Sequence, residues 1–201
     1  MAHAVFYGAM SLDGYLADKD DNLDWLYQQE GGELVPYEAF YQLIDYTMMG
    51  RRTYEVVKRD AQLEILYPEK ENFVFSHTDL DVDDNLQVVN EDPITFIQNL
   101  PSEKTIWVVG GGALLQPVIE AGLIEEWWIQ IVPILLGEGV PLFLPQTNQQ
   151  KLKLIETEQF GQFAQLHLKQ AWSKFLYKIN SNAPIPVSYT HLRAHETGAY
   201  L

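Results

Sequence analysis

The stretch TIWVVGGGALL, residues Thr105 to Leu115, places three consecutive glycines between an apolar run and an amphipathic segment. Residues 105–109 are short in extent, β-branched, aromatic and uncharged, which predicts a buried β-strand. Residues 113–121 carry apolar side chains at helical spacing, which predicts a helix. The three glycines are therefore expected where the carboxyl end of a strand meets the amino end of a helix.

This junction has two interpretations. The N–H groups of the first helical turn and the positive end of the helix dipole can hold a phosphate, and glycine lets the backbone approach it closely. The same residues can instead form only a tight turn, because the stretch has neither the GxGxxG spacing nor the GxxxxGK[ST] pattern. A second phosphate site elsewhere in the chain would favour the first interpretation.

Composition limits the class of protein. The chain has 201 residues, 47% hydrophobic and 20% charged, which predicts one soluble domain with a sizeable core. No apolar run approaches the roughly 20 residues of a membrane helix, and no secretion signal is recognised at the amino terminus. The absence of cysteine excludes thiolate metal sites, so we expect a cytoplasmic protein without a bound metal. The formal net charge of −15 argues against nucleic acid and anionic membranes as partners.

Three of the four arginines are gathered in one segment, GRRTYEVVKR, which follows a strand-like stretch. They are Arg51, Arg52 and Arg59, and Lys58 lies among them. The planar donor fork of arginine suits phosphate, so this segment is a second candidate anion site. The alternative is an ordinary solvated helix face. We favour the anion site because arginine is so scarce elsewhere in the chain.

The carboxyl-terminal stretch VSYTHLRAHETGAYL has no apolar periodicity and follows the loop-like SNAPIP. Residues 187–197 resemble one reading frame of a transposase adapter used in DNA library preparation. We therefore expect a domain over residues 1–180, a disordered tail over 181–201, and non-native sequence over 187–201. His191 and His195 have the spacing of metal ligands on a helix, but on this interpretation the spacing is accidental.

Strands and helices are expected to alternate along the chain. The expected strands are residues 4–10, 46–49, 73–76, 86–89, 105–109, 126–132, 152–160 and 163–171. The expected helices are residues 36–44, 53–59, 93–100 and 113–121, the third capped by Asn90 or Asp92. This order predicts a three-layer α/β fold with a mostly parallel central sheet and antiparallel carboxyl-terminal strands. Both candidate phosphate sites fall at carboxyl ends of strands, which predicts an NADP-dependent enzyme.

Several stretches also match one known family in the same order: AMSLDGYLA, DWL, MGRRTYE, VFS, WVVGGGALL and GLIEEWWIQIVPILLGEGVPLF. Over residues 4–171 the sequence resembles the dihydrofolate-reductase-like family. The branch it most resembles is the reductase (carboxyl-terminal) domain of the bacterial riboflavin-pathway bifunctional deaminase–reductase, with its stand-alone relatives. The resemblance implies a three-layer α/β/α reductase that uses NADPH.

The resemblance also implies which residues bind NADPH. Ala9, Leu16 and Ala17 match positions around the nicotinamide, and Arg51 or Arg52 would meet the 2′-phosphate. The family joins the matching glycine pair by a cis peptide bond, here between Gly110 and Gly111. The full implied set is Ala9, Leu16, Ala17, Gly50, Arg51, Arg52, Thr53, Ser76, His77, Val109, Gly110, Gly111, Gly112, Ala113 and Leu114.

Four further residues are implied to act in catalysis. Asp13 begins the mobile loop over the nicotinamide, and Gln130 faces the substrate. Trp25 matches a tryptophan near the substrate, with a loop aromatic anchored on the core as the alternative. Dihydrofolate reductases carry a proton-donating carboxylate at the start of the first helix. Here Glu38 and Glu33 lie nearest to that position, and both are displaced from it.

Two functions from different classes follow. The first is hydride transfer from NADPH to a C=N or C=O bond of a small pterin- or aminopyrimidine-like heterocycle. The second is a catalytically inactive nucleotide-binding protein of the same fold, because a fold does not fix a function. The intact SLDGYLA and DWL stretches favour the first, and the displaced carboxylates favour the second.

The sequence of the last strands predicts that the protein forms an oligomer. Residues 127–132, WWIQIV, are too apolar for a strand with one solvated face, and Trp127 and Trp128 point to opposite faces. Phe160, Phe163 and Trp172 add aromatic surface in the same region. We therefore expect a homodimer through the late strands, with a monomer that covers both faces itself as the alternative.

Overall fold

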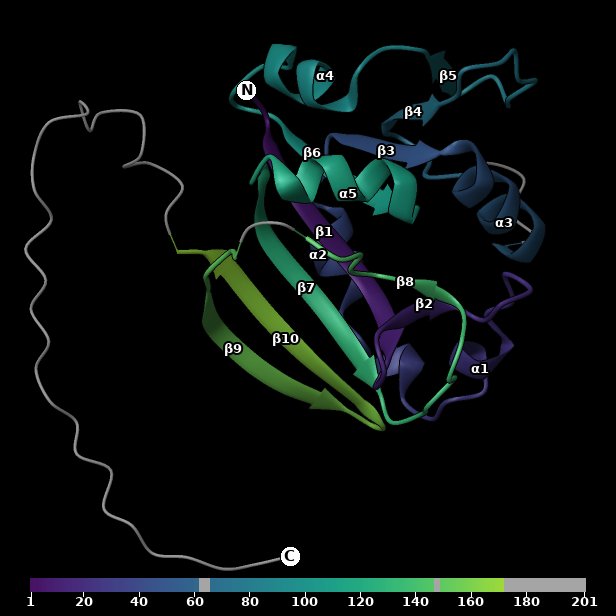
Figure 1. The fold of residues 1–201 in the computed structure, drawn as a ribbon, viewed down its shortest axis with the longest axis vertical. Helices are drawn as coiled ribbons and strands as arrows, with labels where there is room; N and C mark the ends of the chain where they lie inside the picture. Colours follow the sequence, from purple (N-terminus) through teal and green to yellow (C-terminus); the bar gives the residue numbers. More distant parts are fainter. Residues whose placement is uncertain (62–65, 147–148, 172–201) are drawn as a thin grey trace, which may run out of the picture.

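The computed structural model describes residues 1–61, 66–146 and 149–171 (Figure 1). The expected tail over 181–201, the adapter-like stretch from residue 187 and the pair His191 and His195 lie outside the described residues, as does Trp172. Among the helices of the described part, none has the length and apolar character needed to cross a membrane.

A single large sheet organises the described residues, with eight strands in the order β5-β4-β3-β6-β1-β7-β10-β9. From β5 to β7 every neighbouring pair is parallel, whereas β10 is antiparallel to both β7 and β9. The expected mostly parallel sheet with antiparallel carboxyl-terminal strands is therefore confirmed. The strands are β1 (His3–Ser11), β3 (Tyr46–Gly50), β4 (Glu71–Phe75), β5 (Leu86–Val89), β6 (Thr105–Gly110), β7 (Ile124–Val132), β9 (Leu152–Phe160) and β10 (Phe163–Gln170).

A small second sheet was not expected from the sequence. It pairs β2 (Tyr15–Ala17) with β8 (Val140–Pro141) in antiparallel register. The two strands are too short for a hydrophobic period to reveal them. Their pairing brings the loop after β1 against the loop after β7, beside the carboxyl end of β1 (Figure 1).

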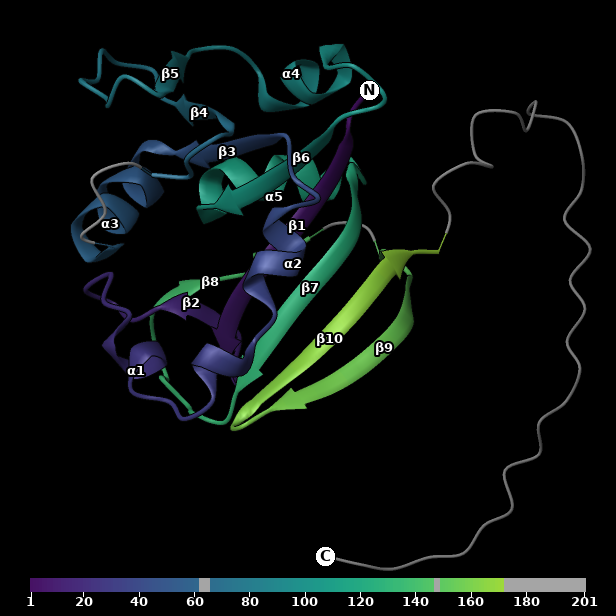
Figure 2. The same cartoon turned by 180° about the vertical axis from the view of Figure 1, so that it is seen from behind.

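Helices cover both faces of the sheet and make the third layer. One face carries α4 (Pro93–Asn99) and α5 (Gly112–Glu120), and the opposite face carries α2 (Tyr37–Tyr41) and α3 (Arg51–Ala61) (Figures 1 and 2). The apolar positions read from the sequence of α5 pack in the larger core cluster, with Phe6 and Val108 of the sheet. On the other face, Phe40 packs on Val5 and Trp107. Two short helices, α1 (Asp24–Tyr27) and the 3₁₀ turn η1 (Gly32–Leu34), lie in the loop before α2.

The observed helices differ from expectation most at α2 and α3. The expected helix over residues 36–44 is shorter, since α2 ends at Tyr41, and α3 begins at Arg51, directly after β3, rather than at residue 53. Of the two caps considered for α4, Asp92 is the one used, because its side chain accepts a hydrogen bond from the Thr95 N–H. The start of α3 therefore places Arg51 and Arg52 within its first turn.

Both faces of β7 are covered within this chain. Trp127 is 1% exposed, and its ring centroid lies 5.5 Å from that of Phe6. Trp128 faces the other way, stacked on His167 at 4.5 Å and in edge contact with Phe40 at 5.4 Å. The tryptophan pair, which led us to expect a partner subunit, is thus packed by the chain's own residues.

Candidate active site

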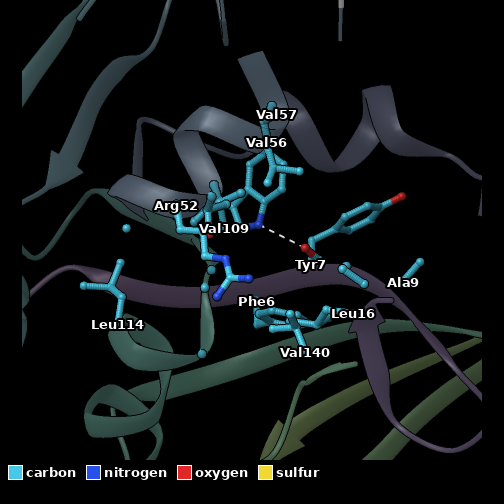
Figure 3. Close-up of a pocket in the computed structure, with 18 of the residues that line it drawn as sticks. Phe6, Tyr7, Ala9, Leu16, Arg52, Val56, Val57, Val109, Leu114 and Val140 are labelled. Atoms are coloured by element: carbon cyan, nitrogen blue, oxygen red, sulfur yellow. Dashed lines mark hydrogen bonds between the residues drawn. The ribbon is translucent and has the colours of Figure 1, made fainter. Parts of the chain in front are cut away.

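A cavity of about 1270 Å³ opens at the carboxyl ends of β1, β3 and β6 (Figure 3). Every residue that the resemblance assigned to NADPH lines this one cavity, from Ala9 on β1 to Leu114 on α5. These residues come from five separate stretches of the chain, which the parallel sheet brings to the same edge. The cavity is large enough for a dinucleotide with a small second molecule beside it.

Two helix starts meet in the wall of the cavity. β3 ends at Gly50, and α3 begins at the next residue. β6 ends at Gly110, and α5 begins two residues later, at Gly112. Met49 and Gly110 are register partners on the adjacent strands, so the two helix starts are neighbours. The first N–H groups of each helix have no acceptor within the helix and lie at its positive dipole end. Two backbone segments whose geometry suits an anion therefore face one space.

Glycine is required where these helix starts approach each other. The backbone of Gly110 has φ +135°, a conformation that side-chain-bearing residues rarely adopt, and the Gly110–Gly111 peptide is cis, which confirms the expectation. A Cβ placed on Gly111 would lie 2.8 Å from Thr53 Oγ1, too close for an undisturbed contact. The triple glycine thus leaves a cradle between α3 and α5 that a side chain would fill.

The basic residues of α3 fall into two groups, one that lines the cavity and one that lies outside it. Arg51 and Arg52 line the cavity, whereas Lys58 donates to Asp83 at 2.6 Å outside it. Arg51 donates to the Thr78 hydroxyl at 3.0 Å and to Glu55 at 2.8 Å, both on the side of α3 nearest β4. Ser76 and His77 line the same part of the cavity. We call this part, made by Arg51, Arg52, Ser76 and His77 with the two helix starts, the arginine end.

Asp21 is an unexpected member of the arginine end. It lies in the loop between β2 and α1, at φ +61°, and its carboxylate accepts from Arg52 Nε at 2.7 Å. Its carbonyl oxygen also accepts from Arg59 Nη2 at 2.9 Å. Two arginines of α3 thus hold this loop across the cavity, and one of them is paired with a carboxylate of the chain itself.

Aromatic side chains line the other part of the cavity, which we call the aromatic end: Tyr7, Tyr37, Tyr67 and Trp107. Trp107 is the centre of this group, since its ring lies 6.1 Å from Tyr7, 6.1 Å from Tyr37 and 5.2 Å from Tyr67. Its indole N–H donates to the Tyr7 carbonyl at 3.1 Å, the dashed line in Figure 3. Figure 3 shows Arg52 and Leu114 on one side of the site and Tyr7 and Ala9 on the other.

The phenols of the aromatic end stay protonated at neutral pH. Burial raises the pKa of Tyr7 to about 12 and raises the pKa of Tyr37 and Tyr67 in the same direction. The sequence analysis did not name these residues. One signal was available, because Tyr7 lies two residues before Ala9 on a strand and so shares its face.

Gln130 lies where the sequence analysis expected it, in the wall of the cavity on β7 beside Ala9 of β1. The side chain is 2% exposed. Its Nε2 donates to Gln165 Oε1 at 2.7 Å, and Gln165 Nε2 in turn donates to Glu158 Oε2 at 3.2 Å. A chain of three side chains across β7, β10 and β9 therefore fixes the Gln130 amide.

The other three residues implied in catalysis do not line this cavity. Asp13 accepts from the Ser11 hydroxyl at 2.6 Å and from the Gly137 N–H at 2.7 Å, and the Ser11 bond is the main cause of its lowered pKa. Asp13 thus ties the turn after β1 to the loop after β7. Glu38 is exposed, and its carboxylate accepts a long bond from the Gln42 amide at 3.4 Å. Glu33, the other displaced carboxylate, does line the cavity.

Trp25 is placed in the core rather than in the wall of the cavity. It is 8% exposed and packs in a cluster with Val132 and Phe163. This position corresponds to the alternative of a loop aromatic anchored on the core. A motif match alone did not distinguish the two, because both place a tryptophan in the same loop.

The fold is that of the dihydrofolate-reductase-like proteins. Residues 3–166 match the family model of the RibD C-terminal domain, and the chain belongs to that family. The resemblance stated from the sequence is therefore confirmed. The Bacillus subtilis protein YwjB, itself uncharacterized, is 39% identical over 170 residues, which cover 83% of this chain and 97% of YwjB.

Solved structures agree with this assignment. A Shewanella sp. PV-4 protein whose name links it to riboflavin biosynthesis superposes with a TM-score of 0.75 at 30% identity, covering 85% of this chain and 99% of that one. Dihydrofolate reductase from Enterococcus faecalis, solved with NADP(H), gives a TM-score of 0.57 at 12% identity, covering 84% and 96%. The second likeness shows the shared fold.

Proposed function

We propose that the protein is a reductase that transfers hydride from NADPH to a C=N or C=O bond of a small pterin- or aminopyrimidine-like heterocycle. One observation carries the proposal: a single cavity joins two helix starts and Arg51 and Arg52 at one end to an aromatic wall and Gln130 at the other. Membership of the RibD C-terminal family supports a reductase. The NADP(H) in the Enterococcus enzyme supports the choice of cofactor.

The residues present fit NADPH. The glycine cradle beside Thr53, together with the free N–H groups of two helix starts, suits a pyrophosphate. Arg51 and Arg52 suit the 2′-phosphate, which distinguishes NADPH from NADH. Ala9, Leu16 and Ala17 line the cavity on the far side from Arg51 and would border the nicotinamide, which supplies the hydride when NADPH is bound.

The chain itself supplies orientation and a dry surface. Tyr7, Leu16 and Val140 border the cavity with apolar surface that excludes water from the transfer. The buried Gln130 amide presents a fixed polar group at the same place. Asp13 acts one step further away, by holding the turn that carries β2 and hence Leu16 and Ala17.

The alternative function, an inactive nucleotide-binding protein, has one observation in its favour. The resemblance left Glu38 and Glu33 as displaced candidates for the proton donor, and Glu38 does not line the cavity, so Glu33 is the one that remains. Loss of a proton donor would leave cofactor binding intact while abolishing reduction.

NADPH oxidation measured by absorbance, with a panel of pterins, pyrimidines and quinones, separates the two. We expect at least one pterin or pyrimidine to be reduced, at a rate that saturates with its concentration. NADPH binding in the low micromolar range without oxidation by any member of the panel would instead identify the inactive protein. The Arg51→Ala, Arg52→Ala double variant is the control that connects oxidation to this cavity.

We also propose a cytoplasmic homodimer formed through the late strands. β9 is an edge strand, and its side chains Leu152, Leu154 and Ile155 are 36%, 54% and 43% exposed. In the described part of the chain, no helix lies over β9 or its neighbour β10 in either view (Figures 1 and 2). An exposed apolar edge of this kind is a pairing surface.

Sedimentation at micromolar concentration tests the assembly. We expect a dimer for the native chain and a monomer for Leu154→Asp, which places a charge on the apolar edge. Thr157→Asp adds the same charge to β9 without removing apolar surface, and we expect it to remain largely dimeric. A native chain that sediments at the monomer mass would contradict the proposal.

A further inference from the structure

One residue of the aromatic end has a backbone conformation that is rare for its type. Tyr67 has φ +46°, and Glu69, two residues later, has φ +65°. In this left-handed region a bulky side chain is an outlier, because its Cβ crowds the following carbonyl oxygen. Such conformations persist only where the surrounding structure holds them, and they are concentrated at sites that bind ligands. Tyr67 lines the cavity, so the strained residue and the candidate site coincide.

Side chains from three other parts of the chain hold this segment. The carbonyl oxygens of residues 66, 67 and 68 each accept a hydrogen bond from a distant side chain, in that order from Asn85 at 2.6 Å, Asn72 at 3.1 Å and the Tyr41 hydroxyl at 2.6 Å. We call these three hydrogen bonds the carbonyl clamp. Three consecutive carbonyls fixed from outside the segment leave its backbone little freedom to relax.

Asn72 is the best anchored donor of the carbonyl clamp. It is 0% exposed and lies on β4, between β3 and β5 in the sheet. Its Oδ1 accepts from the Thr47 hydroxyl at 2.7 Å, and its NH₂ group donates to the Lys70 carbonyl at 3.0 Å as well as to that of Tyr67. Turning this amide would leave buried groups unpaired. The central sheet therefore fixes the donor that holds Tyr67.

The Tyr67 ring lies between the cavity and the protein core. It meets the Trp107 ring edge to face, with the centroids 5.2 Å apart. It also packs against two core clusters, one that contains Met49 and one that contains Val5. Protein cores are close-packed, so the space behind the ring is filled. A flat molecule that reaches this ring from the cavity cannot extend past it.

We infer that the Tyr67 ring, held in place by the carbonyl clamp, is the wall that sets the largest ring system the substrate can have. The inference rests on the proposed function for the location of the substrate, and it deepens that function by adding a size limit. Tyr67 contacts the substrate. Asn72, Asn85 and Tyr41 are positioning residues, because they act through the backbone of the Tyr67 segment.

Lumazine and alloxazine are a matched pair of probes, since alloxazine is lumazine extended by one fused benzene ring. Each is titrated into the full chain saturated with NADP⁺, and binding is followed by fluorescence. We expect the native protein to bind lumazine at least tenfold more tightly than alloxazine. Tyr67→Ala opens a ring-sized space, so its preference for lumazine should fall below threefold. Tyr67→Phe keeps the ring and should discriminate as the native protein does.

Tyr67→Gly keeps the test decisive if the alanine variant does not fold. Glycine also removes the ring, and it adopts positive φ without strain. We expect Tyr67→Gly to melt at a higher temperature than Tyr67→Ala and to show the same loss of preference for lumazine. A glycine variant that melts below the alanine variant would overturn the strained conformation on which the clamp depends.

A further variant separates positioning by the clamp from packing. The double variant Tyr41→Phe, Asn85→Ala removes two of the three donors and keeps the Tyr41 ring. We expect its preference for lumazine to fall at least threefold while NADP⁺ affinity is unchanged. The matched control is Tyr15→Phe, which also removes a hydroxyl bonded to a carbonyl, that of Gly137 at 3.3 Å. It should retain the native preference. An unchanged preference in the double variant would overturn the role of the clamp.

The outcomes distinguish this inference from the proposed function. Equal binding of the two rings by the native protein, or no binding of lumazine, would overturn the inference whatever NADPH oxidation shows. Continued exclusion of alloxazine by both Tyr67→Ala and Tyr67→Gly would overturn it as well. Discrimination that disappears with the Tyr67 ring, in a protein that reduces no member of the panel, supports the inference and contradicts the proposed reductase.

Discussion

At the arginine end of the cavity, the groups that suit a ligand are backbone N–H groups and cations supplied by two short stretches, residues 50–53 and 109–114. At the aromatic end, they are rings and an amide supplied by β1, β6, β7, α2 and the segment after α3. The first end suits a multiply charged anion, whereas no lysine or arginine is among the described residues that line the second. A charged cofactor is therefore disfavoured at the aromatic end, and an apolar ring is disfavoured at the arginine end. One cavity can in this way orient a cofactor and a substrate relative to each other.

The largest expected effect is a loss of NADPH affinity caused by substitutions at the arginine end alone. Replacing Arg51 and Arg52 by alanine removes the two side-chain cations that suit the 2′-phosphate, while the helix starts that suit the pyrophosphate remain. Because hydrogen bonds to charged groups contribute about 1.5–3 kcal/mol each, NADPH affinity should fall about 50-fold or more. NADH affinity should fall less than threefold, as measured by fluorescence titration of each cofactor.

Lys58→Ala is the control for this double variant. It removes a cation from the same helix, but one that is paired with Asp83 and lies outside the cavity lining. Its NADPH affinity should stay within twofold of the native value. Equal losses of NADPH and NADH affinity in the double variant would refute the assignment of the arginines to the 2′-phosphate.

A second change sharpens the description of the glycine cradle. Gly111→Ala places a methyl group against Thr53 Oγ1, where only 2.8 Å is available. Overpacking of this kind costs about 1–3 kcal/mol, so affinity for NADPH and NADH should fall together by about tenfold. Adding Thr53→Ala removes the opposing hydroxyl and should recover most of the loss in the same titration. A double variant no better than Gly111→Ala would show that the clash with Thr53 Oγ1 is not what lowers the affinity.

These two ends also differ in how far the sequence revealed them. At the arginine end, every residue except Asp21 was named from the sequence: the two helix starts because a strand, a glycine and a helix start are consecutive in the chain and leave a local pattern, and Ser76 and His77 from the resemblance. The aromatic end was missed, because Tyr7, Tyr37, Tyr67 and Trp107 lie on separate segments and no spacing connects them. Only the register of the strands brings them together.

The carboxylates show the same limit. The sequence analysis named Glu38 and Glu33 together, both displaced from the expected position, and could not decide between them; Glu33, in the turn Gly32–Leu34, lines the cavity, whereas Glu38 does not. The Gln162 N–H, just before β10, donates to the Glu30 carbonyl at 3.0 Å, which fixes the chain at the start of this turn. A contact between residues about 130 positions apart has no signature in a local motif. The same holds for Gln165, which only the pairing of β10 with β7 places beside Gln130.

A third change tests the aromatic end in isolation. Tyr37 is 39% exposed, so Tyr37→Leu should fold, yet it removes a ring that contacts both Tyr7 and Trp107. Aromatic pairs contribute roughly 0.5–1.5 kcal/mol, so the KM for a reduced heterocycle should rise about fivefold. NADPH affinity should not change, and Tyr37→Phe, which keeps the ring, should behave as the native protein. A parallel fall in NADPH affinity would show that the two ends are not independent.

The smallest expected effect concerns the carboxylate that already occupies the arginine end. Asp21 accepts hydrogen bonds from Arg52, so a 2′-phosphate that binds Arg52 must compete with it. The pair is exposed, and exposed ion pairs contribute only about 0–1 kcal/mol, so Asp21→Asn should raise NADPH affinity by about threefold and leave NADH affinity unchanged. Asp20→Asn makes the same change of charge one residue earlier, at a side chain that does not meet Arg52, and it separates direct competition from a general electrostatic effect. A gain for NADPH in both variants would assign the effect to net charge, whereas a gain in Asp21→Asn alone would identify Asp21 as an internal competitor that tunes cofactor choice at the arginine end.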